Sequence, residues 1–348
     1  KTVTRDFQLE APFPTTVMAA SEQALLQVGL IGAGRIARCH LASIASMSTK
    51  VKVVHISDPW EQGIADLSAQ YGISRASADW KDLIADPEVQ AVIICSPTAL
   101  HADQIIAAAE AGKKIFCEKP VSLDISIVNQ VADVIKKTNA FCMVAFQRRF
   151  DSNFMRIKQA VEDGTVGNLK MIHIVSRDPA PPPVTYIAQS GGLHMDMCIH
   201  DFDMAMWVAG SPIVEVMVMG GCTVDPKIAE AGDIDTSVVM GKCANGTIVT
   251  IDNCRATTYG YDQRFEAFGS NGAISTDNRS PNQCTIMGGN GVVKDKPMSF
   301  FMDRYAEAYT AEMEAFVDCC RANKPAPCGV EEGRVATVVA MAAKEYQT

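Results

Sequence analysis

The sequence predicts an α/β protein of two domains: a parallel, doubly wound sheet, followed by an α/β domain with a large, mainly antiparallel open sheet. Three observations support this fold class. An apolar run leads into a glycine-rich turn and an amphipathic segment, strand and helix patterns alternate as far as about residue 146, and strand patterns with hairpin turns dominate from about Pro212. A chain of 348 residues is long enough for two domains that each bury a core.

The first 26 residues contain Pro12 and Pro14 and show no clear periodicity. We therefore expect an N-terminal arm over 1–26, a nucleotide-binding domain over 27–146 and a second domain over 147–348. The arm lacks the apolar core of a secretory signal. A cytoplasmic protein is expected, and import into an organelle after removal of a leader is left open.

Val28–Ile31 has the pattern of a buried strand, and it runs directly into Gly-Ala-Gly-Arg-Ile-Ala at residues 32–37, with a helix after it. Gly32 would allow the tight turn, Gly34 would let the backbone approach a pyrophosphate, and Ala37 would permit close contact between helix and strand. This order of strand, glycine turn and helix predicts a Rossmann domain that binds a dinucleotide.

Asp58 carries the information on which dinucleotide binds. It follows the second strand, Val51–Ser57, about 20 residues beyond the turn, where the fold places its ribose ligand. A carboxylate accepts hydrogen bonds from both ribose hydroxyls and repels a 2'-phosphate, so NAD is predicted. Arg38 keeps NADP open as an alternative, although an exposed helical arginine also explains it.

The next elements bring further polar groups to the same edge of the sheet. A strand at 91–95 and a helix from about His101 to Ala111 precede the strand Lys114–Cys117, so Lys119 lies at a carboxyl end, where open parallel sheets bind ligands. A further helix and strand, up to residue 146, complete the domain. The predicted cofactor-binding residues are Gly32, Gly34, Arg35, Ile36, Asp58, Ser96, Pro97, His101, Glu118 and Lys119.

The second domain contains two hairpin signals and two closing helices. Asn245-Gly246 and Asn271-Gly272 each lie between strand patterns. The closing helices are expected at about 301–321 and 331–345. A sheet with one uncovered face commonly needs a partner, so oligomers through that face are expected.

Asp196 and His200 are the candidate acid/base pair. Their spacing of four residues places them on one face of a helix, where Asp196 can orient His200. Lys119 lies beside the expected nicotinamide site, where its ammonium could stabilise negative charge on oxygen and lower the pKa of His200. Asp203 is an alternative orienting residue, and Asp196 could instead bind a substrate hydroxyl. Purely structural roles are the alternative for all of these residues.

A metal site is not expected on this helix. His194 and Cys198 are four residues apart, but His194 and His200 are six apart and point to different faces, so no face gathers three ligands. The 12 cysteines form no C-x-x-C pair and are expected to be reduced.

Charge and hydropathy exclude two classes of partner. A net charge of −9 and a pI near 5.2 oppose broad contact with phosphate backbones, so no nucleic acid is expected. No apolar stretch reaches the length of a membrane helix, so no membrane span is expected.

Several polar residues are candidates for contact with a substrate. Of Arg148 and Arg149, at the end of a strand beside the expected cleft, one is expected to be structural and the other to contact substrate or cofactor. Asp178 ends another strand, and the segment 259–262 offers two tyrosines and an aspartate, with packing as the alternative role.

These residues resemble the Gfo/Idh/MocA oxidoreductase family, and within it the inositol 2-dehydrogenases, over about residues 27–347. The general signs are G-A-G-R-I-A, C-E-K-P and D-x-x-x-H. The more specific ones are S-R-D-P-A-P-P-P, G-G-L-H-M-D-M-C-I-H-D-F-D-M-A, T-T-Y-G-Y-D-Q-R-F-E-A-F-G-S-N-G and R-Y-A-E-A-Y. Gln147, Met206 and Trp207 depart from the residues frequent in relatives.

The resemblance implies that NAD accepts a hydride from a ring carbon as an alcohol becomes a ketone, with myo-inositol giving 2-keto-myo-inositol (scyllo-inosose) and His200 as general base. It also implies a homodimer or homotetramer built through the C-terminal sheet. Another cyclic polyol or aldose, such as scyllo-inositol or glucose, and a non-catalytic dinucleotide-binding assembly protein are the alternatives. The implied catalytic residues are Lys119, Asp196 and His200, and Arg148, Asp178 and Tyr261 are implied to join them in lining the polyol pocket.

Overall fold

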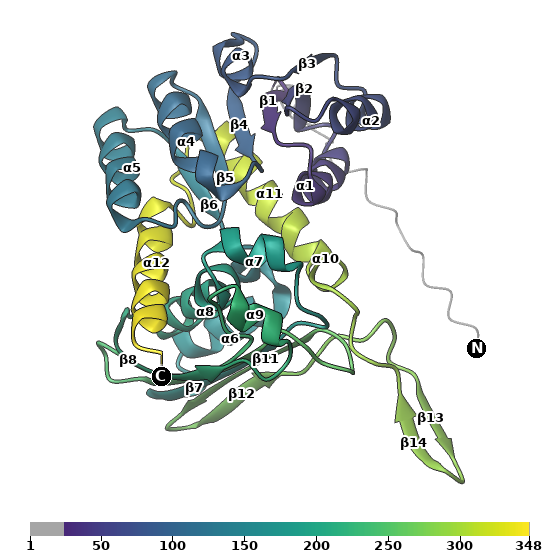
Figure 1. Cartoon of the computed structure of the whole chain (residues 1–348), viewed down its shortest axis with the longest axis vertical. Helices are drawn as coiled ribbons and strands as arrows, with labels where there is room; N and C mark the ends of the chain where they lie inside the picture. Colours follow the sequence, from purple (N-terminus) through teal and green to yellow (C-terminus); the bar gives the residue numbers. More distant parts are fainter. Residues whose placement is uncertain (1–23, 348) are drawn as a thin grey trace, which may run out of the picture.

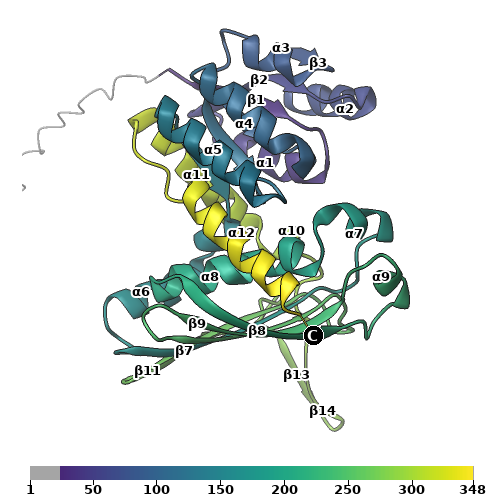
Figure 2. The same cartoon turned by 60° about the vertical axis from the view of Figure 1, so that its left-hand side comes forward.

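The computed structural model describes residues 24–347, so the predicted arm at 1–26 lies almost entirely outside the described residues. The described chain has an upper body built on a parallel sheet and a lower body built on a second, larger sheet (Figure 1). Two long helices near the C-terminus, α11 (Ala306–Ala322) and α12 (Val330–Glu345), run between the two bodies (Figure 2).

The upper sheet is entirely parallel, with strand order β3-β2-β1-β4-β5-β6, which is the predicted doubly wound arrangement. Its central strands β1 and β4 are almost entirely apolar and buried because helices cover both faces. The strands are β1 (Leu26–Ile31), β2 (Val51–Ser57), β3 (Arg75–Ser77), β4 (Ala91–Ile94), β5 (Lys114–Glu118) and β6 (Cys142–Ala145), and the helices are α1 (Arg35–Ala45), α2 (Glu61–Tyr71), α3 (Trp80–Ala85), α4 (His101–Glu110) and α5 (Ile125–Thr138).

Packing crosses the sequence boundary predicted at residue 147. Met313, Phe316 and Val317 of α11 are fully buried in the same core as strands β1 and β2, on the face that α1 and α2 also cover. The N-terminal body is therefore completed by a helix from the far end of the chain. The division of the chain into two domains at residue 147 stays a prediction.

The lower sheet is mixed, with order β12-β11-β7-β10-β9-β8. β7 and β10 are parallel and every other pair is antiparallel. Both predicted hairpins are present, as β9–β10 and β11–β12. The strands are β7 (Leu169–Arg177), β8 (Ile213–Gly221), β9 (Thr236–Cys243), β10 (Ile248–Cys254), β11 (Asp262–Gly269) and β12 (Gly272–Thr276).

Helices cover only the face of this sheet that is turned toward the Rossmann domain (Figure 2). The main ones are α6 (Ser152–Glu162), α8 (Ile199–Ala209) and α12, and the short ones are α7 (Val184–Ser190), α9 (Pro226–Glu230) and α10 (Phe301–Arg304). The predicted single helix over 301–321 is wrong. The chain leaves helical geometry at Tyr305 (φ −111°, ψ 15°), whose ring is fully buried, and this residue separates α10 from α11.

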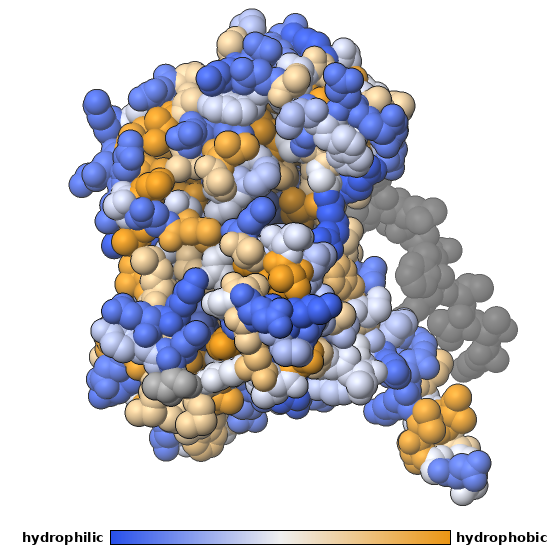
Figure 3. Space-filling model, viewed as in Figure 1, coloured by the Kyte–Doolittle hydropathy of each residue, from blue (hydrophilic) through white to orange (hydrophobic). Residues whose placement is uncertain are grey.

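A third, two-stranded sheet was not predicted. The hairpin arm, β13 (Thr285–Gly288) with β14 (Gly291–Lys294), projects beyond the uncovered face of the lower sheet in both views (Figures 1 and 2). Its apolar side chains lie in the open along the projection, next to its hydrophilic tip (Figure 3). Ile286, Met287 and Val292 are 71%, 78% and 69% exposed. Between residues 24 and 347 we find no helix that combines the length and apolar character needed to cross a membrane.

Candidate active site

The glycine turn between β1 and α1 has the shape that a dinucleotide phosphate needs. Gly32 has φ +102°, and a Cβ atom there would lie 2.6 Å from the carbonyl oxygen of Cys95, so only glycine fits. A Cβ on Gly34 would meet nothing within 4 Å, so the space over the N-terminus of α1 is open. No side chain caps this helix and its first turn contains no acidic residue, which leaves its N–H groups to an anion.

Asp58 lies at the carboxyl end of β2, as predicted, and is joined to the glycine turn. Its Oδ2 accepts a hydrogen bond from the Ala33 N–H at 2.7 Å, and its Oδ1 accepts one from the Trp60 N–H at 2.7 Å. Each carboxylate oxygen retains acceptor capacity for a ribose hydroxyl. Arg35, at the start of α1, is exposed, with its guanidinium 5.7 Å from the Phe300 ring centroid, and the adjoining Ile36 is half-buried.

The β4–α4 loop contains three further predicted cofactor residues, and one of them is corrected. Ser96 is half-buried and donates its hydroxyl to Gln104 at 2.6 Å, while Pro97 is exposed. His101 is fully buried, and its two ring nitrogens lie 2.8 Å from the carbonyl oxygens of Pro120 and Ser96. With both nitrogens occupied by backbone, His101 ties this loop to the β5 loop and does not offer a ring nitrogen to a cofactor.

Glu118 is the last residue of β5, and Lys119 follows it directly. Glu118 Oε1 lies 2.6 Å from Nε2 of His40, a fully buried residue of α1. Lys119 points toward the second domain, where its Nζ donates to the backbone carbonyl of Asp196 at 2.7 Å and lies 3.8 Å from Asp196 Oδ1. Lys119 and Asp196, which the resemblance places in one catalytic set, are therefore in contact across the two domains.

His200 lies at the start of α8 and contributes a neutral imidazole. Burial lowers its pKa well below the usual value, and the positive charges of Lys119 and Arg148 lower it further. The ring packs edge-on against Phe146 at 6.0 Å between centroids. Nδ1 is enclosed without a partner among the described residues, and Nε2 makes no hydrogen bond there either, so Nε2 is the nitrogen available to a ligand.

The expectation that Asp196 orients His200 is wrong. Asp196 lies in a π-helical turn, His194–Cys198, immediately before α8, and its side chain is turned to other partners. Oδ1 accepts a hydrogen bond from the Tyr186 hydroxyl at 2.8 Å, and Oδ2 accepts one from Nη1 of Arg255 at 3.1 Å. The alternative orienting residue, Asp203, is also occupied, by a two-pronged pair with Arg149.

Tyr186 and Arg255 are the site residues that sequence reasoning missed. Tyr186 lies on α7, just after the proline-rich loop, and is about half exposed. Arg255 follows β10 and is fully buried. A signal was available, because a charged residue directly after an alternating strand, at the carboxyl end of a strand parallel to β7, should lie beside Asp178.

Asp178 is the second carboxyl group of the site. Its backbone N–H donates to the Cys254 carbonyl at 2.9 Å, which places it beside the end of β10. Burial raises its pKa to about 6, against the lowering effect of Arg255 and with a further raising effect of Asp196. Its carboxylate has no hydrogen-bond partner among the described residues, so it is available to a ligand.

Arg148 and Arg149 are both engaged in ion pairs. Arg148 is buried, with Nη1 2.5 Å from Asp201 Oδ1 and its guanidinium 5.7 Å from the Tyr305 ring centroid. Tyr261 is also buried, 6.1 Å from the same ring. Arg149 pairs with Asp203. A role of Arg148 and Tyr261 in substrate binding stays a prediction.

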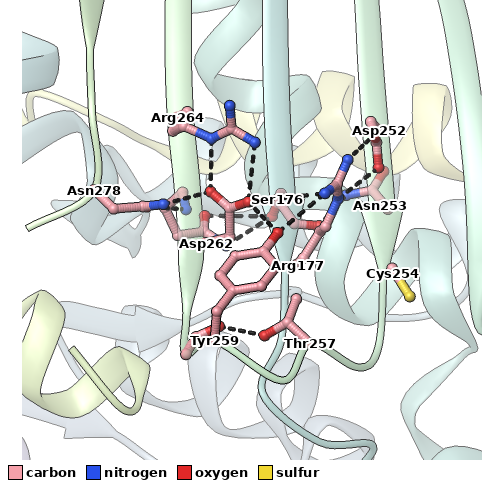
Figure 4. Close-up of polar contacts among 12 residues, drawn as sticks. Ser176, Arg177, Asp252, Asn253, Cys254, Thr257, Tyr259, Asp262, Arg264 and Asn278 are labelled. Atoms are coloured by element: carbon pink, nitrogen blue, oxygen red, sulfur yellow. Dashed lines mark hydrogen bonds and ion pairs between the residues drawn. The ribbon is translucent and has the colours of Figure 1, made fainter. Parts of the chain in front are cut away.

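Asp262 belongs to a different network, on the uncovered face of the lower sheet (Figure 4). It is buried beneath its partners: Arg264 donates to both of its oxygens, at 2.8 and 3.0 Å, and the Tyr259 hydroxyl donates at 2.6 Å. The other members of the network are Arg177, Asp252 and Asn278. Because residues alternate between the faces of a strand, Tyr261 points to the opposite side.

The histidine and cysteine once considered as metal ligands have other contacts. His194 Nε2 lies 3.2 Å from the Ser237 hydroxyl, and Cys198 Sγ lies 3.0 Å from Oδ1 of Asn253. Within residues 24–347 no group of three or more His, Cys, Asp or Glu side chains has the arrangement of a metal site.

Comparison with known proteins identifies the family to which the Rossmann domain and the C-terminal domain belong. Residues 26–146 match the oxidoreductase family described as having an NAD-binding Rossmann fold, and residues 154–275 match the GFO/IDH/MocA C-terminal domain. The chain belongs to the GFO/IDH/MocA family of oxidoreductases, and its cofactor is NAD. The predicted family, fold class and cofactor are confirmed.

Relatives of known sequence are similar along almost the whole chain. An uncharacterised oxidoreductase of Bacillus subtilis, YrbE, is 42% identical over 91% of this chain and 93% of its own length. The myo-inositol 2-dehydrogenase of Thermotoga maritima is 39% identical over 92% of this chain and 96% of its own.

Solved structures share the fold. A probable dehydrogenase from Thermotoga maritima superposes with a TM-score of 0.90 at 39% identity, covering 92% of this chain and 97% of its own. The scyllo-inositol dehydrogenase from Lactobacillus casei, solved with NAD(H) and scyllo-inositol, gives a TM-score of 0.87 at 28% identity, covering 93% and 97%.

Proposed function

We propose that this enzyme oxidises one ring hydroxyl of myo-inositol to a ketone, giving 2-keto-myo-inositol, with NAD as the oxidant. The observation that carries the proposal is the neutral, half-buried His200 with a free ring nitrogen near the Lys119 ammonium, at the edge where a parallel sheet binds its ligands. The similarity to the Thermotoga maritima myo-inositol 2-dehydrogenase supports the choice of alcohol.

His200 takes the hydroxyl proton at Nε2. A base that is uncharged at neutral pH can accept a proton without first losing one, and burial keeps His200 uncharged. The nearby Lys119 ammonium stabilises the oxygen as it gains negative charge. NAD, when bound, accepts the hydride from the ring carbon.

The two carboxylates hold the ring. Asp196, fixed by Tyr186 and Arg255, and Asp178, without a protein donor, face a substrate that carries a hydroxyl on every ring carbon. An ionised carboxylate is an acceptor only, so it selects ligands with hydroxyl donors. Wrong placement of one hydroxyl leaves a buried acceptor unpaired, which costs about 1–3 kcal/mol and provides discrimination between isomers.

The test is NAD reduction with a panel of myo-inositol, scyllo-inositol, other inositol isomers and glucose. We expect the highest kcat/KM for myo-inositol, and a loss of about 10²–10⁴-fold in kcat for His200→Gln and Lys119→Met while NADH still binds. The Lactobacillus casei structure contains scyllo-inositol, which makes this isomer the second candidate substrate. A higher kcat/KM for scyllo-inositol would change the proposed substrate and leave the proposed mechanism in place. Wild-type turnover by Lys119→Met would refute the mechanism.

We further propose that the uncovered face of the lower sheet joins copies of this chain into a homodimer or homotetramer. Met217, Met219 and Met240 on this face are 65%, 74% and 47% exposed, and the hairpin arm extends past the same face with apolar side chains on both of its sides. A twofold pair would cover both features at once.

Sedimentation should give a dimer or tetramer at micromolar concentration, and Met217→Glu/Met240→Glu should give monomers. A monomeric wild-type chain would remove the assembly proposal. It would leave the catalytic proposal in place.

A further inference from the structure

Arg255 lies where the lower sheet meets the π-helical turn His194–Cys198, which we call the catalytic turn because it contains Asp196. The proposed mechanism assigns Arg255 no chemical step. Its side chain is 1% exposed, and Nη1 lies 3.1 Å from Asp196 Oδ2 while Nη2 lies 3.7 Å from Asp233 Oδ2. Its backbone N–H donates to the Asp235 carbonyl at 2.8 Å. The guanidinium therefore spans the distance between a site carboxylate and a carboxylate of the loop before β9.

Asp233 is itself attached to the start of the catalytic turn. Its Oδ1 accepts a hydrogen bond from the Leu193 N–H at 3.0 Å, and a Cβ on Gly192 (φ +92°) would lie 2.6 Å from the same oxygen. Asp196 closes the turn from the other side, donating its backbone N–H to the Gly192 carbonyl at 2.9 Å. Asp233 and Arg255 thus bind the two ends of the segment 193–196, Asp233 at Leu193 and Arg255 at Asp196.

The charge of Arg255 is balanced by the nearby Asp196 and, at longer range, by Asp233. Its Nε and Nη2 are enclosed and have no hydrogen-bond acceptor among residues 24–347, so Asp196 receives its one good hydrogen bond. Removing one member of a buried ion pair leaves an uncompensated charge. Without Arg255, Asp196 would keep the Tyr186 hydroxyl but lose the contact that sets the plane of its carboxylate.

We propose that Arg255, anchored by Asp233, is a positioning residue that turns the Asp196 carboxylate toward the substrate side of Lys119 and away from His200. The inference deepens the proposed polyol dehydrogenase function and rests on it for its kinetic test. The same guanidinium lowers the pKa of Asp178 more than any other positive charge, so both proposed ring-binding carboxylates depend on it.

The kinetic test compares Arg255→Met, Arg255→Lys and Asp233→Asn with the wild type. We expect Arg255→Met to lose about 10²-fold in kcat/KM for the polyol, since misplacement of a site group by about 1 Å costs this much. Arg255→Lys should recover at least about tenfold of that loss, and Asp233→Asn should lose about tenfold. The Kd for NADH should stay within about threefold of wild type in each, because the glycine turn is untouched.

The pH profile supplies a readout that a merely structural role would not change. Removing Arg255 removes a charge that lowers the pKa of Asp178, now about 6, so the acidic limb of kcat/KM should move to higher pH in Arg255→Met and return toward wild type in Arg255→Lys. Arg304→Met is the matched control. Arg304 is equally buried, and its Nη1 lies 2.5 Å from Oδ2 of Asp151, so its ion pair does not involve Asp196. This variant should leave the acidic limb where it is.

Three results would overturn the inference: wild-type kcat/KM in Arg255→Met, parallel losses of NADH binding and turnover, or an acidic limb that moves equally in Arg304→Met. If Arg255→Met does not fold, Arg255→Lys and Asp233→Asn decide by the same criteria. If the wild type oxidises no polyol, the proposed function fails and a crystal structure of Arg255→Lys tests the inference separately. An Asp196 carboxylate unchanged in position there would contradict it.

Discussion

His194 should make the protein sensitive to mild acid. The residue is fully buried in the π-helical turn, and burial lowers its pKa to about 4, with the charges of Lys344 and Arg255 lowering it further. In the unfolded chain a histidine titrates near ~6.5. Below that pH the unfolded state binds a proton at His194 and the folded state does not. The free energy of unfolding therefore falls as the pH drops from about 6.5 toward 4.

The size of this effect follows from the two pKa values. Between pH 7.5 and pH 5, the difference between about 6.5 unfolded and about 4 folded amounts to about 2 kcal/mol of lost stability. His194→Gln removes the titration and can keep a polar contact with the Ser237 hydroxyl, which lies 3.2 Å from Nε2. The variant should therefore lose about 2 kcal/mol less than the wild type over the same pH range.

The assay is urea unfolding at the two pH values, followed by the fluorescence of Trp207, which reports on the C-terminal domain. A Trp60→Phe/Trp80→Phe background removes the tryptophans of the Rossmann domain, whose unfolding can be a separate transition. His173→Gln, on the exposed side of β7, controls for loss of an imidazole as such. Equal pH dependence in wild type and His194→Gln would refute the argument that a buried neutral imidazole causes the loss.

Two further outcomes follow from the structure. Gly32→Ala should lower Tm, because the new Cβ lies against the Cys95 carbonyl and the residue has positive φ, at a cost of about 1–3 kcal/mol. Gly34→Ala should leave Tm unchanged and raise the Kd for NADH. Equal Tm values in the two variants would contradict this. Glu312 is fully buried without a hydrogen-bond partner among the described residues, and burial raises its pKa well above the usual value. Ionisation in the unfolded state costs stability as pH rises above about 4.5, so Glu312→Gln should raise Tm more at about pH 8 than at about pH 5, and a smaller gain at pH 8 would count against the assignment.

The order of the Rossmann elements could be predicted because each depends on local sequence. β1, the glycine turn and α1 follow one another within the chain, β4 is apolar along its length, and β5 has an apolar, buried centre. The break at Tyr305 was not predictable in this way. It depends on a ring that packs against Tyr261 and Phe154, and those residues come from distant segments. The hairpin arm was missed because β13 and β14 pair only with each other and lack the alternation that a half-buried strand shows.

The site was predictable where strand ends determine it. Lys119 follows directly from the end of β5, and His200 lies in the first turn of the predicted helix that became α8. The partners of Asp196 were not, because spacing of four residues describes an α-helix and the chain forms a π-helical turn there. Arg255 is 59 residues further along the chain, and the end of strand β10 places it beside the Asp196 carboxylate. Helical periodicity cannot report such a contact.

The departures at Met206 and Trp207 now bear less on which isomer is oxidised. Both residues lie beyond His200 on α8, and the Trp207 ring is 5.9 Å from the cationic groups of Arg149 and Lys158, on the side that packs against α6. A residue held there acts on the ring of the substrate only through the helix. The groups that can distinguish an axial from an equatorial hydroxyl are those with free acceptor capacity in the site, Asp178 and Asp196. Exchanging Asp178 for Asn should therefore change the order of isomers in the polyol panel, while Met206→Leu should leave that order intact.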